Sequence, residues 1–479
     1  MRTIIIFLLL ITTCAVNAQQ SDRQQFIRVE APVIALTHVR VIDGTGAPVA
    51  EDQTLIISEG KISGVGSNAN VPANAKVLDL NGYTVLPGLV GMHDHMFFPM
   101  GGTPPMYSNM GFSFPRLYLA LGVTTIRTTG SVQPYLDLEI KKLIDAGRMI
   151  GPKMHITAPY LEGPGSFTPV MHTLTGPDDA RKMVNFWADL GATSFKAYMN
   201  ITRDELRVAV EEAHKRGLKI TGHLCSIGYR EAGEIGIDNL EHGLLANSEY
   251  VANKQPDKCP GAAVGQSLRQ LDINSDAVKE TIRTLVAKNV AVTSTLPVFE
   301  AGAPLASAQA GPTAIGAPSA VLNPRVLNVM NNEARVRYLT ARSRIAGDSP
   351  SPILIRKSMD FERAFVAAGG LLIAGLDPTG NGGVVAGFGD LREVELLVEA
   401  GFTPLEAIKI ASLNGAKFLG EDSRIGSIAI GKQADLMIVK GNPAAKISDI
   451  ENVEIVFKDG VGYDSEKLIQ SVQGLVGIR

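Results

Sequence analysis

The chain has 479 residues, of which 45 are Lys or Arg and 48 are Asp or Glu, and its formal net charge is -3. With 45% hydrophobic residues, 49 Gly and 26 Pro, the composition is that of an ordinary globular protein and excludes a disordered or collagen-like chain. The charges balance and form no long run of one sign, which argues against a nucleic-acid partner and leaves a small-molecule substrate.

Residues 1–18 are predicted to be a secretory signal peptide. Arg2 gives a positive start, Ile4–Ile11 is an unbroken apolar run, and Ala18 is a small residue at the cleavage position. This run is too short to span a bilayer, and no later stretch of the sequence is long and apolar enough for a membrane span. We therefore expect an exported protein, periplasmic or secreted, with a lipid anchor at Cys14 as the alternative.

Removal of the signal peptide leaves two cysteines, Cys225 and Cys259. In an oxidising compartment such a pair can form a disulfide. Two buried free thiols are the other interpretation, and neither position has the spacing of a thiolate metal site. The sequence leaves the disulfide and the free thiols open.

Two β-rich ends flank a middle of different character. Residues 28–86 and 422–465 contain short apolar runs separated by turn signals such as Asp43-Gly44 and Asp459-Gly460. We expect both segments to contribute antiparallel strands to one composite β-sandwich domain. The expected strands are Ile34–Ile42, Thr54–Ser58, Lys61–Val65, Val77–Leu86, Ile425–Ile430, Ala434–Val439 and Val453–Lys458.

Residues 87–421 alternate strand, loop and helix, which is typical of parallel strands joined by crossover helices. Helix signals lie between the strands: Thr202 and Glu205 form a capping box, and Gly217 follows the helix that they open. Eight parallel strands that close on themselves make a (β/α)8 TIM barrel, with its chemistry at the carboxyl ends of the strands. The eight expected strands are Leu89–His93, Val123–Thr128, Lys153–Ala158, Thr193–Ala197, Lys219–His223, Ile237–Glu241, Val290–Thr295 and Leu371–Gly375.

One segment breaks this alternation. Residues 300–320 are mainly Ala, Gly, Pro and Ser with almost no charge, and a stretch of helical character follows over 324–344. We interpret 300–345 as a long excursion after the seventh strand. It is either a mobile lid or a packed loop, and the sequence leaves both open.

Two histidines end the first expected barrel strand, in the sequence His93-Asp94-His95. Residues two apart on an extended backbone point to the same side, so both rings can face the barrel mouth and bind one cation. Taken alone, such a pair is more often a surface or core pair. Its position at the end of a barrel strand, after Pro87-Gly88, favours the metal interpretation.

Four more polar residues end or follow other apolar strands. Lys196 lies within an apolar strand, where a charged amine is costly, so it must find a partner or lose its proton. His223, His242 and Asp377 stand at the ends of the fifth, sixth and eighth strands. Because the carboxyl ends of barrel strands meet at one face, these residues can meet the histidine pair there.

With this order of residues, the sequence resembles the binuclear metal-dependent amidohydrolase superfamily, in particular its imidazolonepropionase-like and prolidase-like branch. The resemblance runs from about Ile34 to Gly460. Two positions depart from it: Cys225 stands where dipeptidase-type relatives often have Tyr, which argues against a proline dipeptidase, and Thr128 stands where Asp is common. The motifs that carry the resemblance are Leu86-Pro87-Gly88-Leu89-Val90-Gly91-Met92-His93-Asp94-His95, Gly122-Val123-Thr124-Thr125-Ile126-Arg127 and Gly431-Lys432-Gln433-Ala434-Asp435-Leu436.

The resemblance implies a centre of two divalent metal ions, with zinc the expected metal. Lys196, carboxylated by carbon dioxide to N6-carboxylysine, would bridge the two ions, and a desolvated strand favours the neutral amine that this reaction needs. A metal-bridging hydroxide would attack the substrate carbonyl, and Asp377 would pass the proton to the leaving amine. The implied ligands are His93, His95 and Asp377 for the first ion, His223 and His242 for the second, and Lys196 between them.

Three further residues are candidates for substrate contact. His172 lies in the loop after the third strand, where peptidase-like relatives often carry a substrate-contacting His, although a plain loop histidine explains it as well. Tyr198 shares a side of its strand with Lys196, and core packing is the alternative. Tyr229 follows the fifth strand and is a candidate to bind a substrate carboxylate or oxyanion.

The expected activity is hydrolysis of an amide bond in a dipeptide or an N-acyl amino acid. A lactonase, another ester hydrolase or a cyclic-amide hydrolase would use the same binuclear centre and is the alternative. A mononuclear deaminase would not need Lys196, and a non-enzymatic binding protein would not need the full ligand set. The oligomeric state, including a homo-oligomer, is not determined by the sequence.

Overall fold

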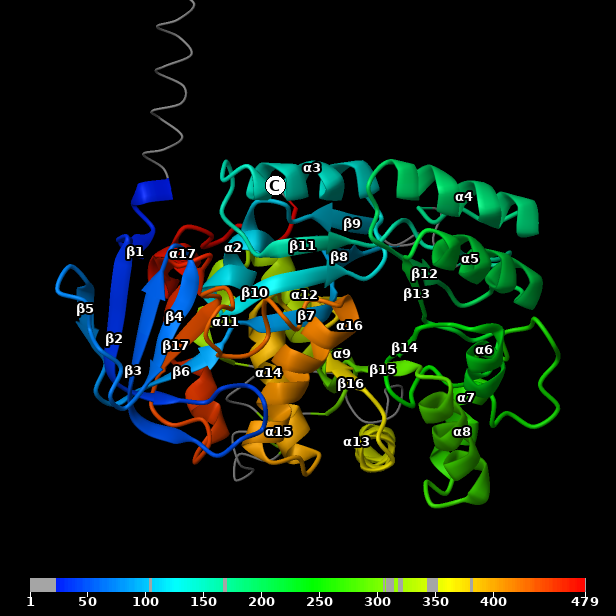
Figure 1. The fold of residues 1–479 in the computed structure, drawn as a ribbon. Coiled ribbons are helices and arrows are strands. Elements are labelled where there is room, and N and C mark those ends of the chain that lie inside the picture. The colour runs from blue at the N-terminus through cyan, green and yellow to red at the C-terminus, as the bar shows by residue number, and fades with distance from the viewer. Residues whose placement is uncertain are drawn as a thin grey trace, which may run out of the picture.

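The structure is a computed structural model that describes residues 23–102, 106–166, 170–304, 306, 314–317, 322–342, 352–379 and 382–478. The predicted signal peptide and Cys14 therefore lie outside the described residues. None of the helices within these ranges has the length and apolar character needed to cross a membrane. Figure 1 shows a sheet domain built near the chain ends beside a larger α/β domain.

Both ends of the chain meet in one nine-stranded sheet, with the order β1-β19-β18-β17-β6-β2-β3-β4 and with β5 paired to β2. C-terminal β17 lies antiparallel to N-terminal β6, with Ile438 opposite Val85, so both ends of the chain contribute strands to this sheet. The described strands form a single sheet, and the two-sheet sandwich is not confirmed. The strands are β1 Ile27–Val29, β2 Val33–Val41, β3 Ala50–Ser58, β4 Lys61–Gly66, β5 Lys76–Asp79, β6 Tyr83–Pro87, β17 Leu436–Lys440, β18 Val453–Lys458 and β19 Val461–Asp464.

Two details of this domain correct the sequence-based expectations. β2 pairs in parallel with both β5 and β6, because the chain crosses from β4 back to β2 before β5 begins, whereas antiparallel strands are expected. The expected strand Ile425–Ile430 is irregular. The positive φ of 81° at Gly426 breaks the extended backbone there, and Ile428 N donates instead to Asp43 O at 2.8 Å.

All eight expected barrel strands are present, and their ends agree with the predictions to within two residues. Every ladder between them is parallel. A hairpin of β8 Phe97–Gly101 and β9 Met106–Asn109 follows the first of them. The eight strands are β7 Leu89–Asp94, β10 Val123–Thr128, β11 Lys153–Ile156, β12 Ser194–Ala197, β13 Lys219–Gly222, β14 Asn239–Glu241, β15 Ala291–Ser294 and β16 Leu372–Ala374.

These strands pair as a three-stranded sheet, β11-β10-β7, and a five-stranded sheet, β12-β13-β14-β15-β16. Isolated parallel bridges, one of them between Thr157 and Ser194, join β11 to β12. On the other side the backbone nitrogen of Asp377, in the loop after β16, donates to the backbone oxygen of His93 near the end of β7 at 2.9 Å. The arrangement is therefore of the TIM-barrel type, although the described strands do not form one closed ladder.

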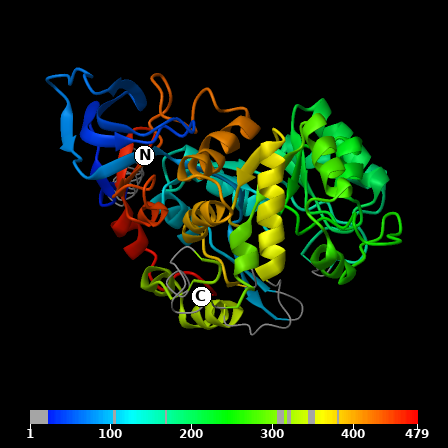
Figure 2. The ribbon, with the colours of Figure 1, turned by 90° about the horizontal axis from the view of Figure 1, so that it is seen from below.

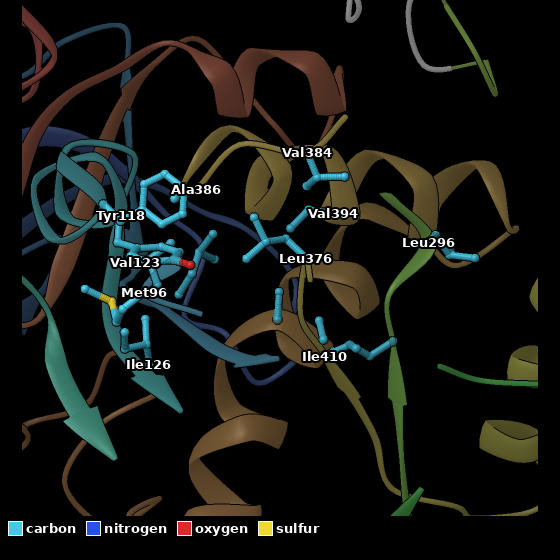
Figure 3. Close-up of a cluster of buried hydrophobic side chains, with 14 of the residues drawn as sticks. Met96, Tyr118, Val123, Ile126, Leu296, Leu376, Val384, Ala386, Val394 and Ile410 are labelled. Atoms are coloured by element: carbon cyan, nitrogen blue, oxygen red, sulfur yellow. The ribbon is translucent and has the colours of Figure 1, made fainter. Parts of the chain in front are cut away.

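Helices and apolar side chains surround the strands. Figure 2 shows the helices from the middle of the chain on the side away from the sheet domain. The core is largely apolar, and Figure 3 shows the part around Met96, Tyr118, Ile126 and Leu376. The helices are α2 Ser113–Ala120, α3 Pro134–Asp145, α4 Pro177–Asp189, α5 Arg203–Lys215, α6 Tyr229–Ile235, α7 Ala263–Gln270, α8 Asp276–Ala287, α9 Leu296–Glu300, α11 Pro324–Val329, α12 Asn332–Arg342, α13 Pro352–Ala367, α14 Phe388–Glu399, α15 Pro404–Lys409, α16 Gly415–Leu419 and α17 Ser465–Gln470.

The described part of the excursion after β15 is packed against the barrel. Glu300 is fully buried, and its two oxygens accept from Arg342 at 3.1 Å and from Arg392 at 2.6 and 3.1 Å. One of those oxygens also accepts from the backbone nitrogen of Gly316 at 2.8 Å. Buried charges of this kind must be paired, so this network ties the excursion to α14. For these residues the packed-loop interpretation agrees with the structure.

Cys225 and Cys259 are bonded to each other. Cys225 follows β13, Cys259 lies before α7, and their Cα atoms are 4.7 Å apart in a disulfide. The bond closes a loop of 34 residues. Of the two interpretations left open by the sequence, the structure therefore contains the disulfide.

Asp137 on α3 should make the stability of the fold depend on pH. Ser131 donates to this buried carboxyl at 2.5 Å, and burial raises the pKa of Asp137 to about 7. Between its unfolded pKa, about 4, and its folded pKa, the folded protein keeps a proton that the unfolded chain has released, so stability falls as the pH rises through this window. We expect Asp137→Asn to remove this pH-dependent decrease in the free energy of unfolding, which is at most about 4 kcal/mol.

Urea unfolding at about pH 5 and about pH 8 would measure the difference between the two proteins. Asp145→Asn, on the same helix but half exposed, is the matched control and should unfold with the pH dependence of the natural chain. An identical pH dependence in the Asp137→Asn protein would show that burial does not perturb this carboxyl.

Candidate metal centre

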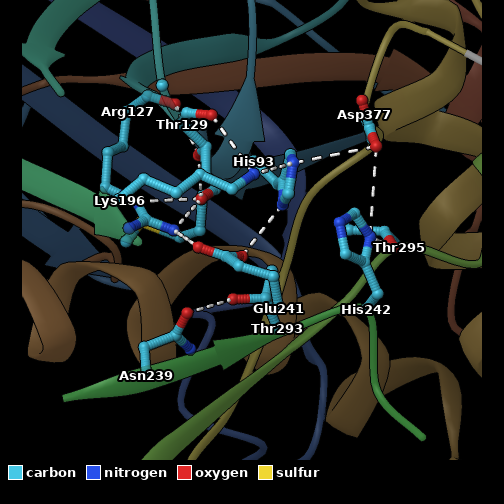
Figure 4. A network of polar contacts seen from close by, with 12 residues as sticks. His93, Arg127, Thr129, Lys196, Asn239, Glu241, His242, Thr293, Thr295 and Asp377 are labelled. Carbon is cyan, nitrogen blue, oxygen red and sulfur yellow. Dashed lines mark hydrogen bonds and ion pairs between the residues drawn. The ribbon is translucent and has the colours of Figure 1, made fainter. Parts of the chain in front are cut away.

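The structure brings the six sequence-predicted ligands together at the carboxyl ends of the barrel strands. Figure 4 shows four of them, His93, Lys196, His242 and Asp377. β7 ends in the sequence that carries His93 and His95, β12 carries Lys196, and the remaining three follow β13, β14 and β16. The ligand atoms of His93, His95 and Asp377 all lie within 4.8 Å of one another, a spacing that one cation could bridge. The other three residues join this group through contacts: Lys196 with His93, His242 with Asp377, and His223 with His242.

Asp377 contacts three of the histidines. Its carboxylate oxygens lie 3.7 Å from His93 Nε2, 3.5 Å from His95 Nε2 and 3.9 Å from His242 Nδ1. Burial raises the pKa of Asp377, but the imidazoles of His93 and His95 outweigh it and hold the pKa well below its usual range. Thr379 donates to the same carboxylate at 2.8 Å and helps to orient it. Asp377 is therefore oriented and ionised, and it could serve as an oxygen ligand.

Lys196 is fully buried beside the first histidine. Its Nζ lies 3.2 Å from His93 Nε2 and 3.3 Å from the backbone oxygen of Thr129, and burial lowers its pKa to about 8. The centroids of the Tyr160 and Tyr198 rings lie 5.5 and 5.8 Å from the amine. The buried setting expected from the sequence is thus observed, and it increases the neutral fraction of the amine relative to an exposed lysine.

The histidines are held in the form that binds metal. Burial, with a contribution from Lys196, lowers the pKa of His93 to about 4 and that of His223 to about 3. His95 and His242 are shifted in the same direction, again mainly by burial. At neutral pH all four imidazoles are therefore neutral, with a ring nitrogen free to donate a lone pair.

His242 and Asp377 have unusual backbone conformations. Their φ angles are 72° and 50°, in the left-handed region that residues other than Gly adopt uncommonly, with Asn, Asp and His the most frequent exceptions. Such strain persists where the surroundings enforce it, and it is common at functional sites. Here it turns both side chains back toward the strand ends, with the rings of His223 and His242 4.4 Å apart.

Neighbouring groups orient the ligands, and the main one, Glu241, was not among the residues predicted from the sequence. Glu241, fully buried at the end of β14, accepts from His93 Nδ1 at 2.9 Å and from Arg127 at 2.9 Å. Gly130 O and Thr295 Oγ1 contact the Nδ1 atoms of His95 and His242 at 3.1 and 2.8 Å. The sequence signal was present, because Glu241 directly precedes a ligand and ends an apolar strand.

A cavity of about 300 Å³ adjoins the centre. Tyr198 lines it and also lies 4.9 Å from the His223 ring, and Phe97, which lines it too, stacks on His95 at 4.6 Å. Its remaining walls come from the loops after β7, β10, β11, β15 and β16. The lining residues are Phe97, Pro99, Gly101, Gly102, Tyr107, Val132, Tyr160, Met171, Tyr198, Arg337 and Thr379.

The other two candidates for substrate contact lie elsewhere. His172 is exposed, and its Nε2 pairs with Asp179 at 2.9 Å on α4. Tyr229 is fully buried, and its hydroxyl contacts the backbone oxygens of Glu241 and Gly243 at 3.0 and 2.9 Å. Neither residue lines the cavity, whereas Tyr198 does.

The sequence model of the amidohydrolase family matches residues 84–461, which are most of the chain. The chain belongs to the amidohydrolase family. This membership confirms the expected superfamily and places this amidohydrolase among hydrolases of carbon–nitrogen bonds. The match contains all six residues of the centre, so the geometry described above lies within the family domain.

Individual relatives are more distant. An imidazolonepropionase of Nocardia farcinica is 31% identical over 102 residues, which are 21% of this chain and 25% of that enzyme. The amidohydrolase therefore aligns with about a quarter of that relative's length.

Two solved structures share the fold over nearly all of their length. One is assigned as a prolidase of Bifidobacterium longum, with TM-score 0.63, 24% identity, and 92% of this chain and 98% of that chain covered. The other is a Xaa-Pro dipeptidase with bound methionine in its active site, with TM-score 0.64, 20% identity, and 90% and 100% covered.

Glu241→Gln should weaken metal binding through the loss of the His93 contact. Groups that orient a metal-bound histidine typically contribute about 10- to 100-fold to metal affinity. The substitution also leaves Arg127 buried without its carboxylate, which should cost about 3 to 5 kcal/mol of stability. Metal titration of the purified protein and its thermal unfolding would measure the two effects.

A double variant, Arg127→Met with Glu241→Gln, separates the two effects. Removing both charges should recover much of the lost stability, because no unpaired charge remains buried. Metal affinity should stay low, since His93 still lacks its carboxylate partner. Affinity equal to that of the natural protein in Glu241→Gln would show that this carboxylate does not orient the ligand.

Proposed function

We propose that the protein is an exported, binuclear metal-dependent amidohydrolase that cleaves the amide bond of a dipeptide or an N-acyl amino acid. The observation that carries the proposal is the meeting of four neutral histidines, a buried lysine and an ionised aspartate at the strand ends. A closed (β/α)8 barrel is part of the proposal. The apolar N-terminal run and the Cys225–Cys259 disulfide support export, because structural disulfides persist in oxidising compartments.

The chemistry of the donor set fits divalent cations such as zinc. Neutral imidazole nitrogens and carboxylate oxygens are preferred ligands of zinc. Five of the six residues are buried, and His223 is partly exposed. His93, His95 and Asp377 would hold one ion, and His223 and His242 the other, with Lys196 between them. When bound, the cations would polarise the scissile carbonyl and acidify a water molecule.

Lys196 would bridge as N6-carboxylysine. Its neutral amine would form a nitrogen–carbon bond to carbon dioxide and release one proton, which leaves an anionic carbamate with two oxygen donors. The lowered pKa of Lys196 supports this step, because an ammonium has no lone pair to attack carbon dioxide. The nearby ring of Tyr198 helps to exclude water from the amine.

Asp377 would act as the proton carrier. Its carboxylate is ionised, so it can accept a proton from the attacking water and deliver it to the nitrogen of the leaving amine. The contact from Thr379 and the left-handed backbone fix the direction of the carboxylate toward the histidines. A positioned group of this kind needs no rearrangement between the two proton transfers.

A substrate panel on the metal-loaded protein tests the activity, with dipeptides and N-acetyl amino acids beside lactones and cyclic amides. We expect amide turnover, and Asp377→Asn should reduce it about 100- to 10,000-fold because the proton carrier is lost. The exposed Asp360 on α13 supplies the matched control, Asp360→Asn, which should turn over amides like the natural chain. Full activity of Asp377→Asn would refute its role, and turnover of lactones alone would replace the amidase proposal with a lactonase.

Carbon-13 NMR tests the lysine carbamate directly. Protein equilibrated with ¹³C-bicarbonate and metal should show a carbamate carbonyl signal that Lys196→Met lacks. Lys196→Met should also bind less metal, because one bridging ligand is gone. Lys215→Met, at an exposed position on α5, should retain both the signal and the metal. A signal that survives in Lys196→Met would place the carbamate elsewhere.

A further inference from the structure

The cavity beside the centre has apolar and aromatic walls and one charged residue. Phe97, Tyr107, Tyr160 and Tyr198 are its rings, and Met171, Val132 and Pro99 add further apolar surface. Arg337, from α12 of the excursion, is the only Lys, Arg, Asp or Glu among the described lining residues. A volume of about 300 Å³ is at the small end of ligand pockets and suits a ligand of roughly one large side chain.

Arg337 reaches the cavity through a gap between two loops. A Cβ on Gly101, at the end of β8, would lie 2.5 Å from Arg337 Nη1, and a Cβ on Gly382, in the loop after β16, would lie 2.6 Å from Arg337 Cγ. Both glycines have positive φ angles, 84° and 88°. The two loops therefore admit the arginine side chain only because they carry glycine at these positions.

The charge of Arg337 is not neutralised within the part of the chain that the structure describes. Its Nε is buried and has no hydrogen-bond partner there. None of the ion pairs within 4.0 Å among the described residues involves Arg337, although Arg342 on the same helix is paired with Glu300. A guanidinium that lines an apolar cavity without an anion is electrostatically suited to receive one from a ligand.

The helix that carries Arg337 is fixed in place. Arg342, in its last turn, donates to Glu300 at 3.1 Å and to Gly383 O at 2.8 Å, and Tyr338 is buried. At its start, Asn331 accepts from Ala334 N at 2.8 Å. A charged side chain on such a support is held near one position, so it loses little entropy when it binds a ligand.

We propose that Arg337 binds the free carboxylate of the substrate while the aromatic walls hold its apolar side chain. The substrate class is then an N-acyl or aminoacyl derivative of an aromatic or large apolar amino acid. Guanidinium and carboxylate match in a bidentate geometry, which would set the direction of the substrate relative to Asp377. Thr379, which lines the cavity and contacts Asp377, connects the two parts of the site. This inference rests on the amidohydrolase activity proposed above.

Two matched substrates test the inference on the metal-loaded protein. N-acetyl-L-phenylalanine and N-acetyl-phenethylamine share the scissile amide and the ring, and only the first has a carboxylate. The natural protein should prefer the first, and Arg337→Met should raise its KM about 10- to 100-fold, as expected for loss of a charged hydrogen bond, with little change in kcat. Turnover of the neutral substrate should be unchanged. Equal effects on the two substrates, or no effect, would overturn the inference.

Arg335→Met is the matched control, because Arg335 lies on the same helix, does not line the cavity and donates to Leu327 O at 3.1 Å. It should leave the preference for the carboxylate intact. Calorimetric binding of 3-phenylpropionate gives a readout that does not depend on turnover. Its affinity should fall about 10- to 100-fold in Arg337→Met. Equal affinity of the natural and Arg337→Met proteins for 3-phenylpropionate would overturn carboxylate recognition. If binding depends on Arg337 but no amide is turned over, only the proposed activity is overturned.

Discussion

A carboxylate buried between two partners holds the centre together. Glu241 has no access to water, and an unpaired carboxylate in this place would carry a desolvation cost of several kcal/mol. Arg127 neutralises one of its oxygens, and His93 contacts the other. Because Arg127 also donates to the backbone oxygen of Met92 at 2.9 Å, one network joins β7, β10 and β14. The orientation of the His93 ring is therefore set by the same contacts that link these three strands.

Contacts that stabilise the fold and the residues of the candidate metal centre lie at opposite ends of the barrel strands. At the amino end of β11, Lys153 pairs with Asp435 at 2.6 Å and with Asp459 at 2.8 Å, which attaches the sheet domain to the barrel. At the carboxyl ends lie the ligands and the loops of the cavity. This division is typical of the fold, and it lets the excursion after β15 add a pocket residue without disturbing the strands. On the inserted helix, Arg342 anchors the excursion through its ion pair with Glu300, and Arg337 lines the cavity.

The parts predicted correctly were those with a local signal. All eight barrel strands, the capping box at Thr202, and the gathering of the six polar residues follow from apolar runs, turn residues and polar strand ends. The parallel pairing of β2 and the irregular path of 425–430 were missed, because pairing partners are chosen by how distant strands pack. Substrate contacts were the least predictable part. Of His172, Tyr198 and Tyr229, only Tyr198 reaches the cavity, since loop positions depend on contacts far apart in the sequence.

Local sequence alone places the side chains of the centre at the ends of their strands, because the strands are short segments in which apolar residues are followed by a polar one. It also determined the family, through motifs that are contiguous in the chain. Three contacts became visible only in the folded chain: Glu241 faces His93 and Arg127, Cys225 bonds to Cys259, and an arginine of the excursion lines the cavity. Each of these depends on groups brought together from distant parts of the chain, where desolvation forces polar atoms to pair and no local pattern records the partner.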